Sequence, residues 1–332
     1  MKTHSNIPIF IPHLGCRMKC VFCSQTKITG VDRAEPELGA ELKRVENIIE
    51  SSLDTLGNDA EIAFFGGSFT GIGEERMTAL LEKASGYLGG KIKGIRCSTR
   101  PDYIDRHICD ILKKYGVTSV ELGVQSTSQK VLDVCRRGHT VEDSEKAIKL
   151  LKEYGFETGG QMMVGLPGST ADDEVKTARD IVSFGADTTR IYPTVVFENT
   201  PLYDMTLSGE YTPLSIEDAP ARCASCARVF IESGVKILRI GLYSSENMTT
   251  APFGANHPAM GELAEGEIYY SMIRDIAEKQ EGSELTLLVP KGSLSKCIGH
   301  GGRNRERLSS LGKTVRFVET DGLKEYDVRI KN

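Results

Sequence analysis

Residues 7–23 read IPIFIPHLGCRMKCVFC, a short apolar run that is followed at once by three cysteines. The apolar run predicts a β-strand, and it places Cys16, Cys20 and Cys23 in the loop at its end. Three thiolates at the spacing C-x3-C-x2-C predict a [4Fe–4S] cluster in which the fourth iron has no protein ligand. An open iron can bind a substrate or cofactor, so the pattern indicates chemistry more than electron storage.

Plainer interpretations of the three thiols stay open. They could be ordinary cysteines, or they could form a zinc site completed by His13. No second pair of ligands follows at the spacing of a zinc site, which favours the cluster. Phe22 precedes the last thiol, and its ring is expected to pack beside whatever the open iron holds.

Strand-like and helix-like segments alternate from residue 7 to about 195. The expected strands are 7–11, 61–65, 93–98, 119–124, 158–164 and 188–192. The expected helices are 37–55, 74–87, 104–114, 141–153 and 171–184. This order predicts an α/β fold with parallel strands and right-handed crossovers, a partial (β/α)6 TIM-like barrel. Its sites are expected at the C-terminal ends of the strands, and the cysteine loop follows the first of them.

The regular alternation stops after residue 193. Residues 197–211 are expected to be irregular and to cross the barrel mouth, and helices are expected at 215–232 and 265–279. We predict a barrel domain over 1–215, a helical and irregular extension over 216–283, and a small basic α+β module over 284–332.

Composition places the chain among globular proteins: 39% of its 332 residues are hydrophobic and 26% are charged. Nine cysteines without an export signal or membrane anchor predict a reducing compartment, so a cytoplasmic location is expected. The net charge is −5, but residues 285–332 hold ten Lys or Arg against five acids, which leaves −10 for the remainder. A basic module on an acidic body indicates a polyanionic partner.

Polar residues stand where several expected strands end. Gly66, Gly67 and Ser68 follow the second strand, where glycines let the backbone approach a ligand or simply form a tight turn. Alternation along the fourth strand puts Glu121 and Gln125 on one side, inside the barrel or on a solvated rim.

Two further polar residues are expected near the same place. Gln161 precedes the end of the fifth strand, and Arg137 is a cation suited to a carboxylate. The remaining cysteines of this region, including the Cys223-x2-Cys226 pair, are expected to be buried packing residues: Cys97, Cys109, Cys135, Cys223 and Cys226.

A glycine-rich loop, IGHGGRN at 298–304, lies between two expected short helices at 293–297 and 305–311, with a strand at 314–319. A G-x-x-G loop between helices resembles the KH fold, where the loop lets a nucleic-acid backbone pass close to the protein. The alternative is a glycine-rich turn in a docking domain. No aromatic stacking platform is evident in this segment. The residues expected to contact RNA are Lys296, Gly299, His300, Gly301, Gly302, Arg303, Arg305 and Arg307.

Longer strings carry a more specific resemblance over roughly residues 7–215. They are GGSFT (66–70), TRPDY (99–103), ELGVQS (121–126), RGHT (137–140) and IYPT (191–194). Together with the cysteines they resemble the radical S-adenosylmethionine (SAM) superfamily, in the branch of the radical-SAM domain of the Elongator catalytic subunit, which modifies wobble uridines of tRNA. The resemblance to oxygen-independent coproporphyrinogen oxidases is weaker. This sequence contains no match to Elongator's acetyltransferase domain, so the same overall reaction is not expected.

The resemblance implies roles for individual residues. Cys16, Cys20 and Cys23 would hold the cluster, and SAM would chelate the open iron. The rest of the SAM pocket would be lined by Gly66, Gly67, Ser68, Gln125, Arg137 and Gln161, with Ser98 standing where the branch commonly has a glutamate. The expected electron donor is a flavodoxin or a ferredoxin.

The sequence therefore predicts a radical SAM enzyme that cleaves SAM to a 5′-deoxyadenosyl radical and modifies RNA, with a tRNA base as the expected target. The basic module would help to deliver the RNA. One alternative keeps the chemistry and takes a small molecule such as a porphyrinogen-like carboxylate. The other is a non-catalytic RNA-binding protein built on a retired barrel.

Overall fold

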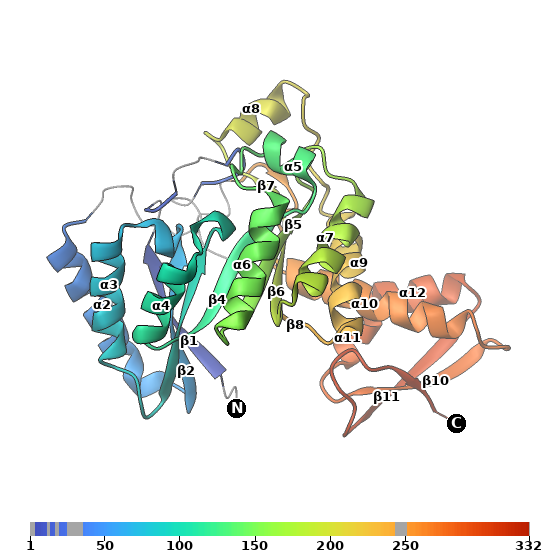
Figure 1. The fold of residues 1–332 in the computed structure, drawn as a ribbon. Coiled ribbons are helices and arrows are strands. Elements are labelled where there is room, and N and C mark those ends of the chain that lie inside the picture. Colours follow the sequence, from blue (N-terminus) through green and yellow to red (C-terminus); the bar gives the residue numbers. More distant parts are fainter. Residues whose placement is uncertain (1–3, 12–13, 17–19, 25–35, 243–250, 332) are drawn as a thin grey trace.

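The computed structural model describes residues 4–11, 14–16, 20–24, 36–242 and 251–331, and its centre is one parallel sheet (Figure 1). The strand order is β1-β2-β3-β4-β5-β6-β8, so each crossover moves one place in the same direction. In the described residues β1 and β8 do not pair with each other, and the sheet is an open, curled half-barrel. The strands are β1 (His4–Ile11), β2 (Asp59–Gly66), β3 (Ile92–Thr99), β4 (Val117–Gln125), β5 (Glu157–Val164), β6 (Thr188–Pro193) and β8 (Lys236–Ile240).

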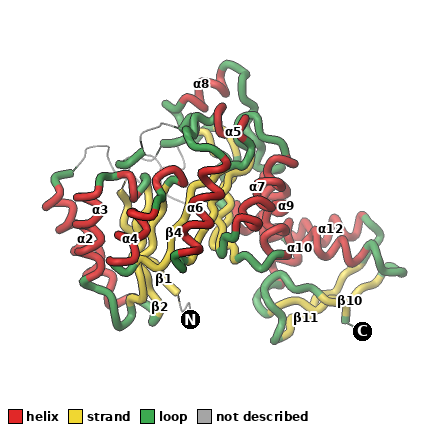
Figure 2. Tube along the Cα trace, in the orientation of Figure 1, coloured by secondary structure: helices red, strands yellow, loops and turns green. Residues whose placement is uncertain are grey.

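Amphipathic helices cover the outer face of this sheet (Figure 2). Along β4, Val120, Leu122 and Val124 are fully buried and belong to the main core, while Glu121 and Gln125 alternate with them on the other face. Alternation therefore leaves polar side chains on the inner face of the sheet. The covering helices are α2 (Leu38–Ser52), α3 (Glu74–Ser85), α4 (Arg106–Lys114), α6 (Val141–Glu153), α7 (Ala171–Phe184) and α9 (Ala219–Glu232).

Local signals in the sequence fix the ends of several helices. Thr140 and Thr170 each cap a helix and form a capping box with the aspartate three residues later. Gly185 ends α7 in the left-handed conformation at φ 102°. The predictions for α6 and α7 are confirmed to the residue.

The predicted fold class is confirmed, and the structure adds a strand that was not expected. β8 pairs with β6 in parallel, beginning at Thr188 and Lys236. Its sequence KILRI mixes two cations into five residues and follows a segment without regular alternation, so its pattern does not stand out. The half-barrel consequently has seven strands where the sequence predicted six.

Two segments after β6 also differ from expectation. Residues 197–211 contain a helix, α8 (Pro201–Leu207), whose N-cap Thr200 accepts a hydrogen bond from the Tyr203 amide at 3.2 Å. A two-residue strand, β7 (Val195–Val196), pairs with β9 (Phe253–Gly254). The helix predicted from residue 215 begins at Ala219, since Ser215 instead accepts from the Asp218 amide at 3.0 Å in the preceding turn.

The C-terminal part of the chain is built on α10 (Met260–Ala277), which begins five residues earlier than predicted. Tyr269, Tyr270 and Ile273 of α10 share a second core with the elements that follow it. β10 pairs in parallel with β11 and antiparallel with β12. These elements are β10 (Glu284–Pro290), α11 (Leu294–Ile298), α12 (Arg303–Ser310), β11 (Thr314–Thr320) and β12 (Arg329–Ile330).

The helices were compared with the length and apolar character that a membrane span requires. None of those in the described ranges is both long enough and apolar enough to cross a bilayer.

A single buried amide connects the three helices of the C-terminal part. The Asn304 side chain on α12 donates to Gly266 O of α10 at 2.8 Å and to Cys297 O of α11 at 3.3 Å. Replacing Asn304 with Ala leaves these buried carbonyls without a donor. We expect the free energy of unfolding to fall by about 1–3 kcal/mol in urea denaturation. Arg303→Ala, at the exposed neighbouring position, is the matched control and should change it by less than about 0.5 kcal/mol; equal effects would contradict this account.

Candidate active site

Two loops meet at the C-terminal ends of β1 and β2. The amide of Gly67 donates to Ile11 O at 2.9 Å, and the amide of Ser68 donates to Leu14 O at 3.2 Å. These bonds join the cysteine loop to the loop after β2. The first thiol is placed by the same contact, since Cys16 Sγ lies 3.3 Å from Ser68 Oγ.

The close approach of these loops requires glycine on both sides. A Cβ atom on Gly67 would lie 2.2 Å from Leu14 O, and one on Gly15 would lie 2.2 Å from Ser68 O. Gly15 also has φ +75°, a conformation that residues with a side chain rarely adopt. Contact between the two loops is therefore sufficient to explain Gly67, which the sequence predicted to meet SAM.

The second thiol is held by the β4 side of the site. Cys20 is buried and accepts a hydrogen bond from Arg137 Nη1 at 3.1 Å. The other terminal nitrogen of Arg137 donates to Gly123 O, so this arginine connects the cysteine loop to β4. The third thiol, Cys23, is half-buried, and its amide donates to Cys20 O at 3.1 Å.

The cysteine loop packs against a group of buried apolar side chains through Val21. Val21 is buried against Leu166 and Leu202, and its backbone bonds Cys135 O and the Leu202 amide. Phe22 packs against the same cluster and is half-buried. This group of apolar side chains therefore includes the Phe22 ring, which the sequence predicted to lie beside the open iron.

Several buried polar atoms at the mouth have no hydrogen-bond partner among the described residues. The Oε1 atom of Gln125 is one, and Gln125 has φ +67°, a strained backbone for a residue of this type. Ser98 Oγ is a second. Both residues were predicted to face the SAM pocket. Ser98 pairs with Glu121, four residues before Gln125 on β4, and unpaired buried acceptors and donors on these neighbouring strands are groups that a bound ligand would satisfy.

A buried histidine and arginine were not assigned to the site from the sequence. Both ring nitrogens of His139 are buried without a partner in the described chain, and Nη1 of Arg100 is likewise unpaired. Burial, together with Arg137 and Arg100, lowers the pKa of His139 to about 3, so its ring is neutral at physiological pH. The string RGHT contained this signal, but only folding shows that the histidine is buried.

Glu121, which the sequence predicted to line the site, is bound by other side chains of the protein. It is 1% exposed, and Arg190 binds both of its oxygens, at 2.6 Å (Nε–Oε2) and 3.0 Å (Nη2–Oε1). Arg96 Nη1 lies 3.3 Å from Oε1, and Gln161 Nε2 donates to Oε2 at 2.9 Å. Side chains of the protein thus bind both oxygens of this carboxylate, and its contact with the cofactor stays a prediction.

The same network extends across the inner face of the sheet. Arg96 on β3 also binds Glu61 of β2 at 2.8 Å and Glu157 of β5 at 2.6 Å. Burial alone would raise the pKa of Glu121, but the hydrogen bond from Arg190 and the charges of Arg190 and Arg96 outweigh it and lower that pKa. Glu121 is therefore an anion at neutral pH.

The other cysteines are packing residues, as predicted. All five are buried, and burial raises the pKa of each thiol, so they remain protonated: Cys97, Cys109, Cys135, Cys223 and Cys226.

The residues predicted to contact RNA lie far along the chain on α11, α12 and the loop between them. Two are engaged within the protein: Lys296 binds Glu265 at 3.1 Å, and Arg307 binds Glu267. His300, Gly301, Arg303 and Arg305 are exposed. Gly299 is buried, and Gly302 is partly buried.

The donor chemistry of the mouth fits an iron–sulfur cluster with a bound ligand. Three thiols lie in one loop, with an arginine on one of them and unpaired polar atoms beside them. Over the described part of the chain, no three Cys, His, Asp or Glu side chains converge as a metal site would require. His13, the alternative zinc ligand, lies outside the described residues.

Comparison with known families agrees with this chemistry. The model of the radical SAM superfamily matches residues 10–181, which are 172 of 332 residues. The chain belongs to the radical SAM superfamily. A model of the radical SAM C-terminal domain matches residues 186–270. The chain is therefore an enzyme, and its cofactors are a [4Fe–4S] cluster and SAM.

Relatives place this radical SAM enzyme near Elongator. It is 40% identical over 145 residues to the tRNA uridine(34) acetyltransferase of Methanocaldococcus jannaschii, covering 43% of this chain and 27% of that protein. It is 36% identical over 132 residues to human Elongator complex protein 3, covering 39% and 24%. The chain thus spans about a quarter of the length of these relatives. The structure of Methanocaldococcus infernus Elp3 shares the fold, with a TM-score of 0.63 at 24% identity over 82% of this chain and 63% of that one.

The junction of the two loops can be tested through iron content. Gly67→Ala forces the new Cβ against Leu14 O and should displace the cysteine loop. We expect iron per chain after anaerobic reconstitution to fall at least severalfold. Gly39→Ala, in α2 with its nearest neighbour 3.7 Å away, is the control and should load normally. Normal iron content in Gly67→Ala would show that the junction does not position the thiols.

The charged network predicts a pH-dependent stability. The pKa of Glu121 is lowered on folding, so its carboxylate stabilises the protein fully above the ordinary value of 4.5 and loses this effect as the pH falls through the lowered value. Glu121→Gln should lower the free energy of unfolding by about 3–5 kcal/mol at pH 7, because Arg190 keeps a buried, unpaired charge. Measured by urea denaturation, the difference in free energy of unfolding between the wild type and Glu121→Gln should shrink below pH 4.5. Glu75→Gln, on an exposed face of α3, is the control; a deficit independent of pH would argue against an ionised Glu121.

Proposed function

We propose that this radical SAM enzyme cleaves SAM reductively and uses the resulting 5′-deoxyadenosyl radical to modify a base of tRNA. The observation that supports the SAM site most directly is the arrangement around Arg137. Its guanidinium joins Cys20 Sγ to Gly123 O, and the strained Gln125 with its unpaired Oε1 follows two residues later on β4. A thiol, a cation and an unsatisfied amide at one strand end suit a ligand with both charged and hydrogen-bonding groups.

The roles of the chain's own residues follow from their places. Cys16, Cys20 and Cys23 would hold the cluster, which when bound supplies the electron that cleaves SAM to methionine and the radical. Arg137 would orient the carboxylate of SAM and neutralise charge beside Cys20. Gln125 and Ser98 would donate to or accept from its polar groups, as their unpaired atoms require.

The inner face of the sheet presents paired polar groups beside the proposed site. Arg96, Arg190 and Gln161 each bind Glu121, so a reactive intermediate would meet groups whose hydrogen bonds are already made. Gln161 is predicted to line the SAM pocket, and its amide nitrogen already donates to Glu121. Only the side-chain oxygen of Gln161 would then accept a hydrogen bond from the ligand.

The relatives support RNA as the substrate class. The M. jannaschii relative is named for uridine 34 of tRNA and matches at 40% identity. The match covers 145 residues, so transfer of an acetyl group is not carried over to this chain. A base at the mouth would approach the radical from the open side of the half-barrel, and the electron would come from a flavodoxin or ferredoxin.

The function is tested by assaying SAM cleavage with a reduced flavodoxin. The reconstituted protein should release 5′-deoxyadenosine, and an unmodified tRNA transcript should stimulate that release and acquire a new nucleoside detectable by mass spectrometry. Cleavage that no RNA stimulates would contradict the RNA proposal and direct the search to small molecules such as porphyrinogen-like carboxylates. Absence of cleavage with a full cluster would overturn the radical chemistry and favour a retired enzyme.

The SAM pocket predicts a separation of binding from cluster assembly. Gln125→Asn keeps a residue that tolerates positive φ but withdraws the amide by one methylene. We expect SAM to bind about three- to tenfold more weakly in equilibrium dialysis, with iron content unchanged. Lys130→Ala, exposed on the nearby helix α5 (Gln129–Val134), is the control. Unchanged SAM affinity in Gln125→Asn would remove this residue from the pocket.

A further inference from the structure

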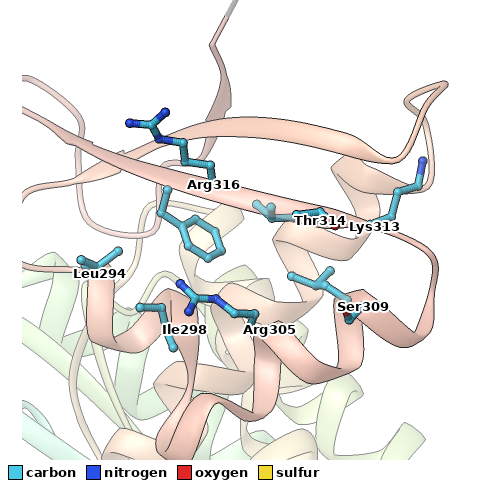
Figure 3. Close-up of a pocket in the computed structure, with 10 residues that line it drawn as sticks. Leu294, Ile298, Arg305, Ser309, Lys313, Thr314 and Arg316 are labelled. Atoms are coloured by element: carbon cyan, nitrogen blue, oxygen red, sulfur yellow. The ribbon is translucent and has the colours of Figure 1, made fainter.

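The C-terminal part of the chain carries a groove between its two short helices and β11 (Figure 3). It encloses about 450 Å³ and is separate from the barrel mouth. Leu308 and Val315 are buried in it, and Phe317 is half-buried. We call it the basic groove; its full lining is Leu294, Ile298, Arg305, Leu308, Ser309, Lys313, Thr314, Val315, Arg316 and Phe317.

Two arginines border this apolar floor, one inside the groove and one at its outer rim. Arg305 on α12 extends along the groove near Ile298, and Arg316 extends outward from β11 (Figure 3). Both arginines are exposed, and neither forms an ion pair with the described residues. Lys313 differs, because its Nζ donates to Gln280 O and Gly282 O at 2.7 Å and fixes the chain there. Apolar surface between unpaired cations suits a polyanion that also carries flat apolar groups.

The loop at the end of the basic groove leaves its backbone open. Gly301 (φ +62°) and Gly302 (φ +85°) have no atom within 4 Å of the place a Cβ would occupy. Their conformation favours glycine, but nothing in the fold fills the space beside them. Gly299 differs, since its Cβ would lie 2.7 Å from Asn304 Cγ. Packing explains Gly299, whereas Gly301 and Gly302 leave room for the backbone of a ligand.

The groove is held rigidly and lies away from the mouth. Arg307 lies over the Tyr270 ring of α10 at 3.4 Å and binds Glu267, and Tyr269 Oη lies 2.9 Å from Ser293 Oγ. These contacts fix α11 and α12 to α10, beside the β8 edge of the sheet. In Figure 1 this part lies at the lower right, whereas α5, α8 and β7, next to the strand ends, lie at the top.

We propose that the basic groove binds a single-stranded segment of the substrate RNA that is remote from the nucleotide being modified. Arg305 and Arg316 would contact phosphates, the open glycines would let the RNA backbone pass, and unpaired bases would rest on Ile298 and Phe317. Bases reach such a floor only where they are unstacked and unpaired. This rests on the proposed function and deepens it: the RNA is held at two places, so a full-length RNA is required for tight binding.

The decisive comparison is between a full-length tRNA transcript and its isolated anticodon stem–loop, which contains position 34, the position for which the M. jannaschii relative is named. Arg305→Glu with Arg316→Glu should weaken binding of the full transcript at least tenfold in fluorescence anisotropy. The logarithm of the association constant falls as the logarithm of the salt concentration rises, and this slope should become less steep by about 1.4. That is the value for two lost phosphate contacts to a single strand, about 0.7 for each. Binding of the stem–loop, and the SAM cleavage it stimulates, should not change. Lys146→Glu with Arg179→Glu, on exposed positions of α6 and α7, is the matched control.

Several outcomes would overturn the proposal. Full-length RNA bound as tightly by the double variant as by its control would remove the groove from RNA binding. An equal loss for the stem–loop would place the reacting nucleotide there instead. Phe317→Leu keeps an apolar residue and should weaken RNA binding severalfold without affecting the weak binding of polyglutamate. A competition assay provides the last control: polyglutamate is added to the wild-type protein with bound RNA, at a concentration that matches the charge of the RNA. Displacement of the RNA would show that the groove binds any acidic chain, including an acidic protein segment.

The same measurements separate this inference from the proposed function. RNA bound through the groove without any stimulation of SAM cleavage would refute the tRNA-modifying function and leave the groove standing. If the stem–loop stimulates SAM cleavage and the groove variants bind full-length RNA normally, the tRNA-modifying function stands and the groove proposal is refuted.

Discussion

Glu121 and the two arginines that bind it are the interaction on which the half-barrel depends. The carboxylate is buried on β4, Arg190 reaches it from β6, and Arg96 reaches it from β3 while binding Glu61 and Glu157. Five neighbouring strands are thereby connected on the face that the helices do not cover. An open sheet cannot fill its inside with the packed layers of a closed barrel, and here paired charges occupy that inner face.

This network also explains why the mouth is the reactive end. Among the described residues, Glu121, Arg96 and Arg190 are paired on the inner face, whereas Gln125 Oε1 at the end of β4 has no partner. Gln125 is strained, Ser98 lacks a partner in the described chain, and Arg137 connects a thiol to the end of β4. The glycine-mediated junction of the first two loops fixes the thiols beside these groups. Part of the backbone strain and of the unsatisfied hydrogen bonds thus lies at the strand ends where the cofactor site is proposed.

Much of this could be read from the sequence, because the patterns were local. Strand and helix periods and the cysteine spacing each depend on a few neighbouring residues. They predicted the half-barrel, α6 and α7, which the structure confirms, and the cluster thiols, which stay a prediction. What the sequence did not show depends on distant partners. Glu121 has the pattern of a ligand-binding carboxylate until Arg96 and Arg190 are folded against it, and Lys296 and Arg307 bind acids of α10 rather than solvent. β8 was missed because pairing with β6, not its own pattern, makes it a strand.

The central claim is that the three thiols hold a [4Fe–4S] cluster whose open iron binds SAM at this mouth. Electron paramagnetic resonance of the reconstituted, dithionite-reduced protein, recorded with and without SAM, tests it most directly. We predict a [4Fe–4S]⁺ signal whose g-values shift when SAM is added. A full complement of iron and sulfide with a spectrum that SAM leaves unchanged would contradict the account.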